Sequence, residues 1–178
     1  MVEGEFAGSC VKVWDEEDAE QVYEDLYYGK FLDGCLRLSP EESLHLVDRD
    51  ELTVVDEGEE MSREALHQVF VDRDEDFVHK YRVYSDLRER GFIVKSGFKF
   101  GAHFRVYPRG VNPYKDGPKK QSEHTQWVVH AVPEDETMSF EEMSRAVRLA
   151  NNIRATMLWA VVDSEAGVTY YEVDHVNP

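Results

Sequence analysis

Long apolar runs and glycine-rich phosphate loops are missing from this chain. No window reaches the roughly 18 consecutive apolar residues that a membrane-spanning helix needs. The opening residues, MVEGEFAGSC, lack the basic and then apolar layout of a secretory signal peptide. These absences predict a cytoplasmic protein with no membrane partner. The chain also has no internal repeat and no Walker motif, and we expect no cofactor.

Cysteine is scarce, with only Cys10 and Cys35 in 178 residues. Their spacing fits neither a metal site nor a disulfide framework, so we expect buried thiols.

Positive charge is scarce in one half of the chain only. Residues 1–80 hold seven Lys and Arg against 24 Asp and Glu, whereas residues 81–178 hold 13 of each. The whole net charge of -17 therefore lies in the first half. An acidic surface is soluble and repels nucleic acid, so any polyanion has to bind to the second half.

The hydrophobic content of 42% and aromatic content of 12% are sufficient for a packed core. The first half predicts a small α/β domain, residues 1–78. It has strand candidates at 9–14, 35–39 and 52–55, a helical pattern within 15–29, and helices beginning after Ser39 and Ser62.

The second half, residues 79–178, predicts a mixed sheet packed by helices, which makes the fold class α/β (α+β). A helix ends at Gly91, and another begins after Ser139 with the spacing of a capping box. The expected strands are FIVKSG (92–97), FKFGAHFRVYP (98–108), TQWVVHAV (125–132), MLWAVVD (157–163) and VTYYEV (168–173).

The stretch KFGAHFRVYPRG, residues 99–110, is basic although the chain as a whole is acidic. Its aromatic and β-branched residues are typical of a strand, and glycines punctuate it. Lys99, Arg105 and Arg109 surround Tyr107 with positive charge. Two interpretations are open: a half-buried strand with solvated basic side chains, or a tyrosine held among cations that also bind a polyanion.

Three segments, taken in order, resemble the archaeal tRNA-splicing endonuclease family, also called tRNA-intron lyases: YRVYSDLRERGFIVKSGFKFGAHFRVYPRG, HTQWVVHAV and RAVRLANNIRATMLWAVVDSEAGVTYY. The resemblance covers most of residues 80–178, and the first half is compatible with the family's N-terminal domain. It implies a restriction-endonuclease-like fold for residues 79–178. It also implies an enzyme that cuts precursor tRNA at bulge-helix-bulge intron junctions without metal.

RNA supplies its own nucleophile for such a cut, the ribose 2′-OH, and the products are a 2′,3′-cyclic phosphate and a 5′-hydroxyl. The enzyme must remove the hydroxyl proton, protonate the departing 5′-oxygen and stabilise the phosphorane charge. The resemblance assigns the first role to Tyr107 and the second role to His124. The cations near Tyr107 favour its phenolate form. The loop before His124 is longer than expected, so His130 is the alternative acid. His103 is a weaker candidate.

The family assigns the third role to a lysine, and the resemblance places this chain's Ala155 at that position. Alanine cannot neutralise a phosphorane, and the comparable loss of an oxyanion-hole donor costs about 10²–10³ in rate. Three explanations are open: an inactivating Lys-to-Ala substitution made to trap uncut substrate or to test the lysine, a natural non-catalytic subunit, or Arg154 in the lysine's role. Neighbouring helical positions point about 100° apart, which argues against Arg154.

Several basic residues are candidates for binding RNA. Arg148 precedes Ala155 by about two helical turns, so one helical face would carry both. The resemblance implies that an arginine here stacks on a bulged base, and an ion pair with Glu141 or Glu142 is the alternative. The remaining candidates are Arg105, Arg109, Lys119 and Lys120, of which the two lysines could equally be solvated in a long loop.

Two features near the C-terminus indicate self-association. The strand VTYYEV is apolar and aromatic and would leave an exposed edge in a monomer. The resemblance implies that such strands pair into dimers and that an acidic loop joins two dimers into a homotetramer. An ordinary edge strand and an ordinary turn are the alternative. The candidate interface residues are Asp163, Glu165, Tyr170 and Tyr171, and the alternative function is a non-catalytic, RNA-binding subunit of such an assembly.

Overall fold

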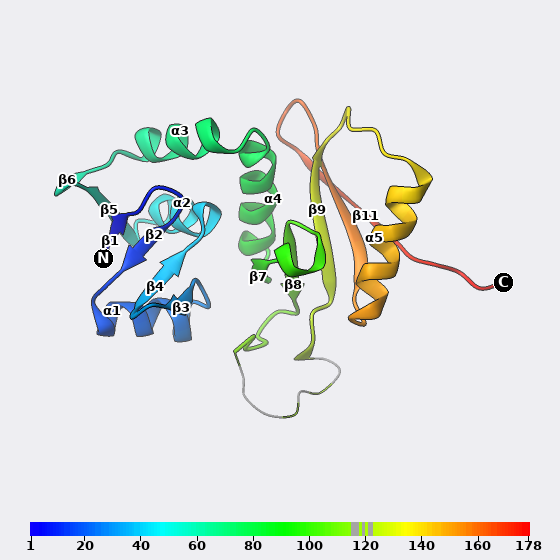
Figure 1. Cartoon of the computed structure of the whole chain (residues 1–178), viewed down its shortest axis with the longest axis horizontal. Helices are drawn as coiled ribbons and strands as arrows, with labels where there is room; N and C mark the ends of the chain where they lie inside the picture. The colour runs from blue at the N-terminus through cyan, green and yellow to red at the C-terminus, as the bar shows by residue number, and fades with distance from the viewer. Residues whose placement is uncertain (115–117, 119, 121–122) are drawn as a thin grey trace. The chain divides into compact units, whose positions relative to one another are not determined.

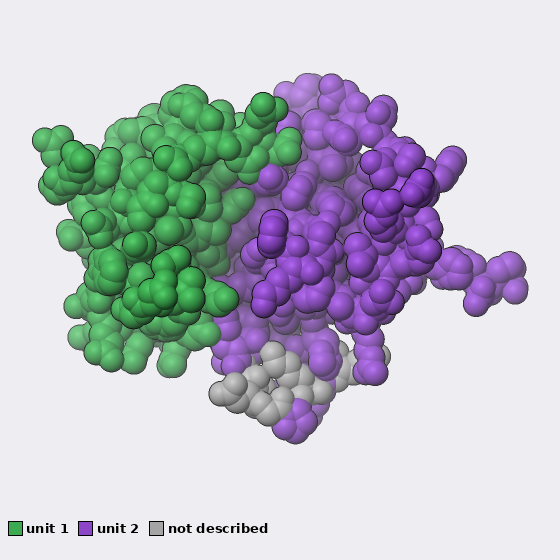
Figure 2. All heavy atoms as spheres, viewed as in Figure 1, with its two compact units in different colours: residues 1–78 green, residues 79–178 purple. Residues whose placement is uncertain are grey.

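The computed structural model of the protein describes residues 1–114, 118, 120 and 123–178. The chain divides into two compact units, residues 1–78 and 79–178, which Figure 2 colours separately. Each unit contains one mixed sheet together with helices (Figure 1), so the expected α/β fold class is confirmed.

The first unit has a six-stranded sheet in the order β3-β4-β2-β1-β5-β6. Its centre is β1 (Val2–Phe6), which pairs parallel to β5 (Leu52–Asp56) and antiparallel to β2 (Val11–Val13). The remaining elements are α1 (Glu16–Glu20), the π-helical η1 (Gln21–Asp25), β3 (Lys30–Leu32), β4 (Cys35–Leu38), α2 (Pro40–Asp48), β6 (Glu59–Glu60) and α3 (Arg63–Arg73).

Local sequence signals place the helices of this unit. Ser39 and Glu42 form a reciprocal capping box at the start of α2, and Ser62 caps α3 through the Ala65 amide. The helical pattern expected within 15–29 ends earlier, because Tyr27 already has a positive φ of 60°. Cys35 is buried, whereas Cys10 is only partly buried, so the expectation of two buried thiols holds for one of them.

The second unit has a five-stranded sheet in the order β11-β10-β9-β8-β7. β10 runs parallel to β9, and all the other neighbours are antiparallel. The elements are α4 (Phe77–Glu89), β7 (Ile93–Ser96), the 3-10 turn η2 (Phe98–Phe100), β8 (Phe104–Tyr107), β9 (Trp127–Pro133), α5 (Phe140–Asn152), β10 (Thr156–Val162) and β11 (Val168–Val173).

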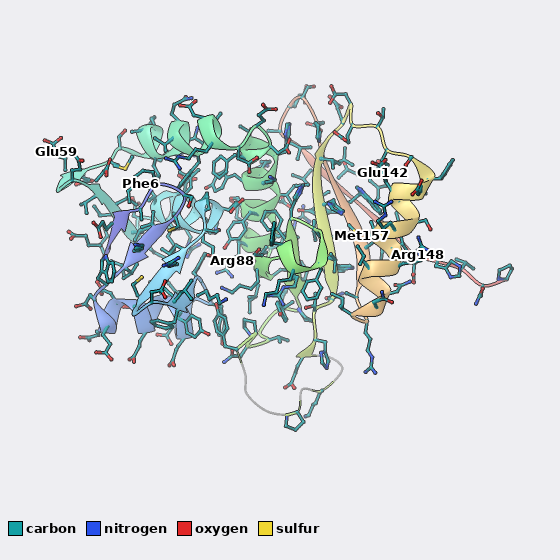
Figure 3. All side chains as sticks on the ribbon, viewed as in Figure 1. Phe6, Glu59, Arg88, Glu142, Arg148 and Met157 are labelled. Carbon is teal, nitrogen blue, oxygen red and sulfur yellow. The ribbon has the colours of Figure 1, made fainter. Side chains whose placement is uncertain are left out.

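The two helices of this unit cover opposite faces of its sheet. The ring of Tyr84 on α4 lies 5.7 Å from the ring of Phe104 on β8. On the other face, Val147 of α5 packs in a buried cluster with Val128 of β9 and Met157 of β10. Figure 3 labels Met157 in this layer between the sheet and α5. Both faces of β10 are covered, which agrees with its apolar composition. Both of its edges are paired, with β9 and β11.

The strand expected over residues 98–108 is only half formed, so that prediction was wrong for its first part. The Phe100 amide donates to the Gly97 carbonyl at 2.8 Å, which closes a 3-10 turn. Gly101 then takes a positive φ of 64°, and β8 begins only at Phe104. A side chain at position 97 would have its Cβ 2.8 Å from the Phe104 backbone, which requires glycine there.

Both helices of the second unit end in the Schellman arrangement, in which two amides beyond the helix bond back into its last turn. At α4 the Gly91 amide donates to Arg88 and the Phe92 amide to Leu87. At α5 the Arg154 amide donates to Asn151 and the Ala155 amide to Ala150, both at 3.0 Å. Residue 154 therefore has a left-handed φ of 59°, and the chain reverses directly into β10.

The cap of α5 provides a test of this packing. Ser139 accepts from the Glu142 amide, and the Glu142 carboxylate accepts from the Ser139 amide. We expect Ser139→Ala to lower the free energy of unfolding by about 1 kcal/mol. Urea denaturation measures this change, with Ser144→Ala on the exposed face of the same helix as the control. Equal effects of the two substitutions would contradict the role of the cap.

Candidate functional site

Three neighbouring strands bring the three predicted catalytic positions to one end of the second sheet. β8 runs antiparallel to β9, so the C-terminal end of β8 lies beside the start of β9. β10 runs parallel to β9, so its start lies at the same end. The Gln126 amide donates to the Val106 carbonyl at 2.8 Å, and the Gln126 carbonyl accepts from Thr156 at 3.0 Å. Tyr107, His124 and Ala155 each lie one or two residues from these bonds along the chain.

Tyr107 is held in place by a cation, in agreement with one part of the expectation. Its side chain is buried, and its phenol oxygen accepts from Nη1 of Arg105 at 3.2 Å. The Arg105 guanidinium is itself fixed, because its Nε donates to the Ser96 carbonyl at 2.9 Å. It also lies 5.3 Å from the centre of the Phe100 ring. The phenol therefore has a positively charged donor in a defined position.

Arg109 has a different environment from the one the sequence predicts. Its guanidinium lies 4.9 Å over the ring of Phe92, and Phe92 in turn contacts Trp127 edge to face. The second expected cation therefore stacks on an aromatic pair at the start of β7 and β9. In the described part of the chain, Arg105 is the cation with a hydrogen bond to Tyr107.

His124 is exposed and lies in the turn that leads into β9. An exposed imidazole at this end of the sheet is accessible to a substrate and can exchange protons with it.

His130, the alternative acid, lies further along β9 in an apolar setting. Its ring stacks on Trp159 at 5.9 Å and meets the His103 ring edge to face at 5.4 Å. The Nδ1 atom of His103 accepts from the Ala131 amide at 2.9 Å. These contacts give both histidines a packing role, which favours His124 over either of them as the acid.

Ala155 is the third residue beyond α5, and its amide closes the Schellman arrangement. Its side chain is only 5% exposed and belongs to the cluster formed with Ala150 and Met157. Arg154 precedes it with a left-handed backbone rather than a helical one. The argument against Arg154 from helical geometry was therefore wrong in its premise, because α5 has already ended at Asn152.

The same helix end corrects the expectation for Arg148. Arg148 is exposed on α5, where Figure 3 labels it, whereas Ala155 is buried beyond the helix, so one helical face does not carry both. The alternative ion pair with Glu141 is also absent among the described residues, because Glu141 pairs with Arg145 at 3.0 Å and Glu142 belongs to the helix cap.

The long loop between β8 and β9 is described only in part. Lys119 lies outside the described residues. Lys120 is exposed, and its amide donates to the Glu123 carboxylate at 2.7 Å.

The four predicted interface residues differ in their surroundings. Tyr171 is 55% exposed on β11, an edge strand of the sheet. Tyr170 points the other way and donates to Asp86 of α4 at 2.6 Å, and Asp86 pairs with Arg90. Burial and this bond raise the pKa of Tyr170 far above its ordinary value.

The acidic turn after β10 has a defined shape. The Asp163 carboxylate accepts from the Glu165 and Gly167 amides at 2.9 and 2.8 Å. The Ala166 carbonyl accepts from Nε of Arg82 at 2.6 Å. Glu165 therefore projects from a turn whose backbone is fixed from both sides.

Lys95 was missed by the sequence reasoning. It lies on β7 directly opposite Arg105 of β8, and it is only 8% exposed. Its ammonium group lies 4.8 Å over the ring of Tyr114. The signal was available, because a lysine inside the apolar run FIVKSG breaks the expected strand pattern.

Two features are absent from the described residues. No group of three His, Cys, Asp or Glu side chains there could hold a metal ion. No helix among these residues is long and apolar enough to cross a membrane.

Two families of known proteins match this chain, one in each half. The family described as "tRNA intron endonuclease, N-terminal domain" matches residues 2–67, and "tRNA intron endonuclease, catalytic C-terminal domain" matches residues 77–170. The chain is thus a two-domain protein of the intron endonuclease type.

Individual relatives agree with this class. The tRNA-splicing endonuclease of Thermococcus kodakarensis is 41% identical over 171 residues, 96% of each chain. That of Methanothermobacter thermautotrophicus is 34% identical over 99% of each chain. A third, from Methanococcoides burtonii, is 36% identical over 97% of this chain but 48% of its own length. The chain belongs to the tRNA intron endonuclease family, as the resemblance in sequence indicated.

The environment of His130 predicts a dependence of stability on pH. Burial lowers the pKa of His130, so the unfolded chain binds a proton at a higher pH than the folded chain does. The free energy of unfolding should therefore fall as the pH drops below about 6.5. Urea denaturation between pH 7 and 5 should show a weaker decline for His130→Phe than for the unchanged chain. His124→Gln, which alters an exposed histidine, is the control, and an unchanged decline in His130→Phe would contradict the assignment.

Proposed function

We propose that this chain is a tRNA-splicing endonuclease that cuts precursor tRNA at bulge-helix-bulge intron junctions. Relatives with the name tRNA-splicing endonuclease match nearly the whole of this chain. The observation that carries the proposal is the pairing of β8, β9 and β10, by which Tyr107, His124 and Ala155 come to one end of one sheet. The junction is a shape rather than a sequence, and a protein reads it through unpaired bases and backbone.

The proposed reaction begins at the ribose 2′-OH. Tyr107, as the phenolate, accepts the hydroxyl proton, and the 2′-oxygen forms a bond to phosphorus. Nη1 of Arg105 donates to the phenol oxygen at 3.2 Å and holds it in position for this step. The bond from phosphorus to the 5′-oxygen then breaks as His124 donates a proton to the departing oxygen. The products are a 2′,3′-cyclic phosphate and a 5′-hydroxyl.

Ala155 leaves this site without the lysine that the family resemblance assigns to it. We propose that the chain cuts slowly for this reason, since an uncompensated phosphorane charge costs about 10²–10³ in rate. The methyl group of Ala155 lies in a buried cluster with Ala150 and Met157, so a lysine here would pack the stem of its side chain against the same cluster.

The basic residues around this site are proposed to bind the RNA. Arg148 is exposed and its guanidinium is available to stack on an unpaired base. Lys119 and Lys120, with Arg109, are proposed to contact the backbone of the RNA.

The assembly is proposed to be a homodimer or homotetramer. β11 is an edge strand with Tyr171 exposed on it, which supports pairing with a second copy. The turn from Asp163 to Gly167 presents Glu165 on a fixed backbone, which supports insertion into a basic surface of another copy. The Tyr170 hydroxyl donates to Asp86 of α4 within its own unit, and this bond would hold β11 in place on the face opposite Tyr171.

A second candidate function is a non-catalytic, RNA-binding subunit. One observation favours it: Ala155 is buried and belongs to the core cluster of its unit. In that case a partner chain would carry the complete active site. The relative from Methanococcoides burtonii is about twice as long as the matched stretch, so chains of this type also occur within longer proteins.

Replacing Ala155 by lysine separates these two functions. We expect Ala155→Lys to raise the single-turnover cleavage rate of a bulge-helix-bulge RNA by about 10²–10³. Ala155→Met, which adds a long side chain without charge, is the control and should leave the rate unchanged. A lysine variant that stays inactive alone, and cuts only with a second polypeptide, would support the non-catalytic subunit instead.

Binding measurements test the proposed role of Arg148. We expect Arg148→Ala to weaken binding of the bulged RNA by about tenfold, since stacking on a base contributes about 1–3 kcal/mol. Affinity for a plain duplex should change little. Arg145→Ala is the matched control, because Arg145 lies on the same helix and pairs with Glu141. An equal loss in both variants would argue against base stacking by Arg148.

A further inference from the structure

The exposed ring of Phe98 is not accounted for by the roles described so far. Phe98 is the first residue of η2, the 3-10 turn between β7 and β8, and it is 87% exposed. A single apolar residue on a protein surface is ordinary and needs no explanation. Phe98 differs because of the place in which the fold holds it and because of the groups that surround it.

The turn that carries Phe98 is well ordered, and its shape does not depend on the Phe98 ring. The Gly97 amide donates to the His103 carbonyl at 2.9 Å, and the Phe100 amide donates to the Gly97 carbonyl at 2.8 Å. The Gly101 amide donates to the Phe98 carbonyl at 3.1 Å. Backbone bonds and glycines therefore form the turn, and the ring extends from it into water. A ring on an ordered backbone loses little further freedom when it binds a ligand.

One side of this turn lies beside the phenol of the proposed reaction. The Arg105 guanidinium, which donates to Tyr107 at 3.2 Å, lies 5.3 Å from the centre of the Phe100 ring. Its Nε donates to the Ser96 carbonyl at 2.9 Å, and the Ser96 hydroxyl accepts from the Phe98 amide at 3.3 Å. Phe98 is therefore midway along the chain between the two residues that hold the guanidinium in place.

The other side of the turn lies beside the end of α5. A Cβ atom at Gly101 would lie 3.7 Å from Cδ1 of Leu149, which is 40% exposed. Leu149 belongs to the last turn of α5, shortly before Ala155. Lys99 follows Phe98 directly, and its side chain is exposed. The surroundings of Phe98 are thus apolar on the side of the helix and positively charged on the side of the phenol.

An exposed aromatic ring beside cations is the combination with which proteins bind unpaired nucleobases. We propose that the Phe98 ring stacks on an unpaired base of the RNA, close to the phosphodiester on which Tyr107 acts. This inference rests on the proposed function. Lys99 attracts the phosphate backbone of the same unpaired segment. Every base has a flat face on which a ring can stack, which suits a substrate that is recognised by its shape.

Binding of a bulge-helix-bulge RNA to the full-length chain, measured by fluorescence anisotropy, tests the proposal. Phe98→Ala should weaken this binding about tenfold, and Phe98→Trp should retain it. Affinity for a plain duplex should not change. The matched control is Phe140→Ala, which removes an 85% exposed ring from the first residue of α5, at the opposite end of that helix from Leu149. Equal effects of Phe98→Ala and Phe140→Ala would contradict stacking by Phe98.

Abasic RNAs identify the base that the ring contacts. Each unpaired base is removed in turn, and at one position the loss should weaken binding to the unchanged chain about tenfold. At that position, Phe98→Ala should bind the abasic RNA as tightly as it binds the intact RNA. Losses that simply add at every position would overturn base stacking. A lower Tm for Phe98→Ala would assign the ring to the fold instead, whereas we expect the Tm to stay unchanged because the ring is exposed.

Sedimentation of the chain without RNA tests a competing occupant, a second copy of this chain. If Phe98→Ala dissociates an assembly that the unchanged chain forms, the ring is covered by that copy and the base site is overturned.

Cleavage measurements separate this inference from the proposed enzyme. If the chain with Ala155→Lys cuts the RNA and Phe98→Ala binds it undiminished, the base site is lost and the enzyme stands. If no variant cuts but Phe98→Ala loses the binding that depends on one unpaired base, the site stands and the reaction is lost. A chain that binds the bulged RNA no more tightly than a plain duplex would overturn both.

Discussion

The two hydrogen bonds of the Gln126 backbone hold the candidate site together. Its amide donates to Val106 of β8, and its carbonyl accepts from Thr156 of β10. The three segments that carry the phenol, the imidazole and position 155 are far apart in sequence, and the backbone of this one residue joins them. Each such bond contributes only about 0.5–1.5 kcal/mol net, so the covered faces of the sheet provide most of the stability. The α4 and α5 layers therefore determine whether the site exists at all.

Position 155 shows how closely the end of a helix and the site depend on each other. Its amide closes the end of α5, and its side chain fills the core beside Ala150. The reversal requires a left-handed residue at Arg154, a conformation that arginine adopts at some cost. Packing therefore fixes the backbone at position 155, whichever side chain is present at that position. This explains how the fold tolerates alanine at a position where a charge is expected.

The sequence predicted the elements with strong local signals and failed where geometry is decided by neighbours. The capping boxes at Ser39 and Ser139 and the glycine end of α4 follow from short-range hydrogen bonds, which a sequence displays directly. The helix end after Asn152 was missed, because no glycine marks it and Arg154 takes the left-handed position instead. The contact between Arg105 and Tyr107 followed from residue spacing along one strand. The opposition of Lys95 and Arg105 depends on register between two strands, which composition does not reveal.

The uneven charge along the chain has a consequence for how a polyanion arrives. All of the net charge of -17 belongs to residues 1–80, while the stretch that holds the candidate site is neutral overall and locally basic. The acidic unit repels such a molecule, and the locally basic stretch of the second unit attracts it. Dissolved ions screen both forces over about 10 Å at 0.1 M, and they weaken these long-range forces more than they weaken binding at the site itself. At high salt concentration, the encounter between the protein and the polyanion would then depend chiefly on the shapes of the two molecules.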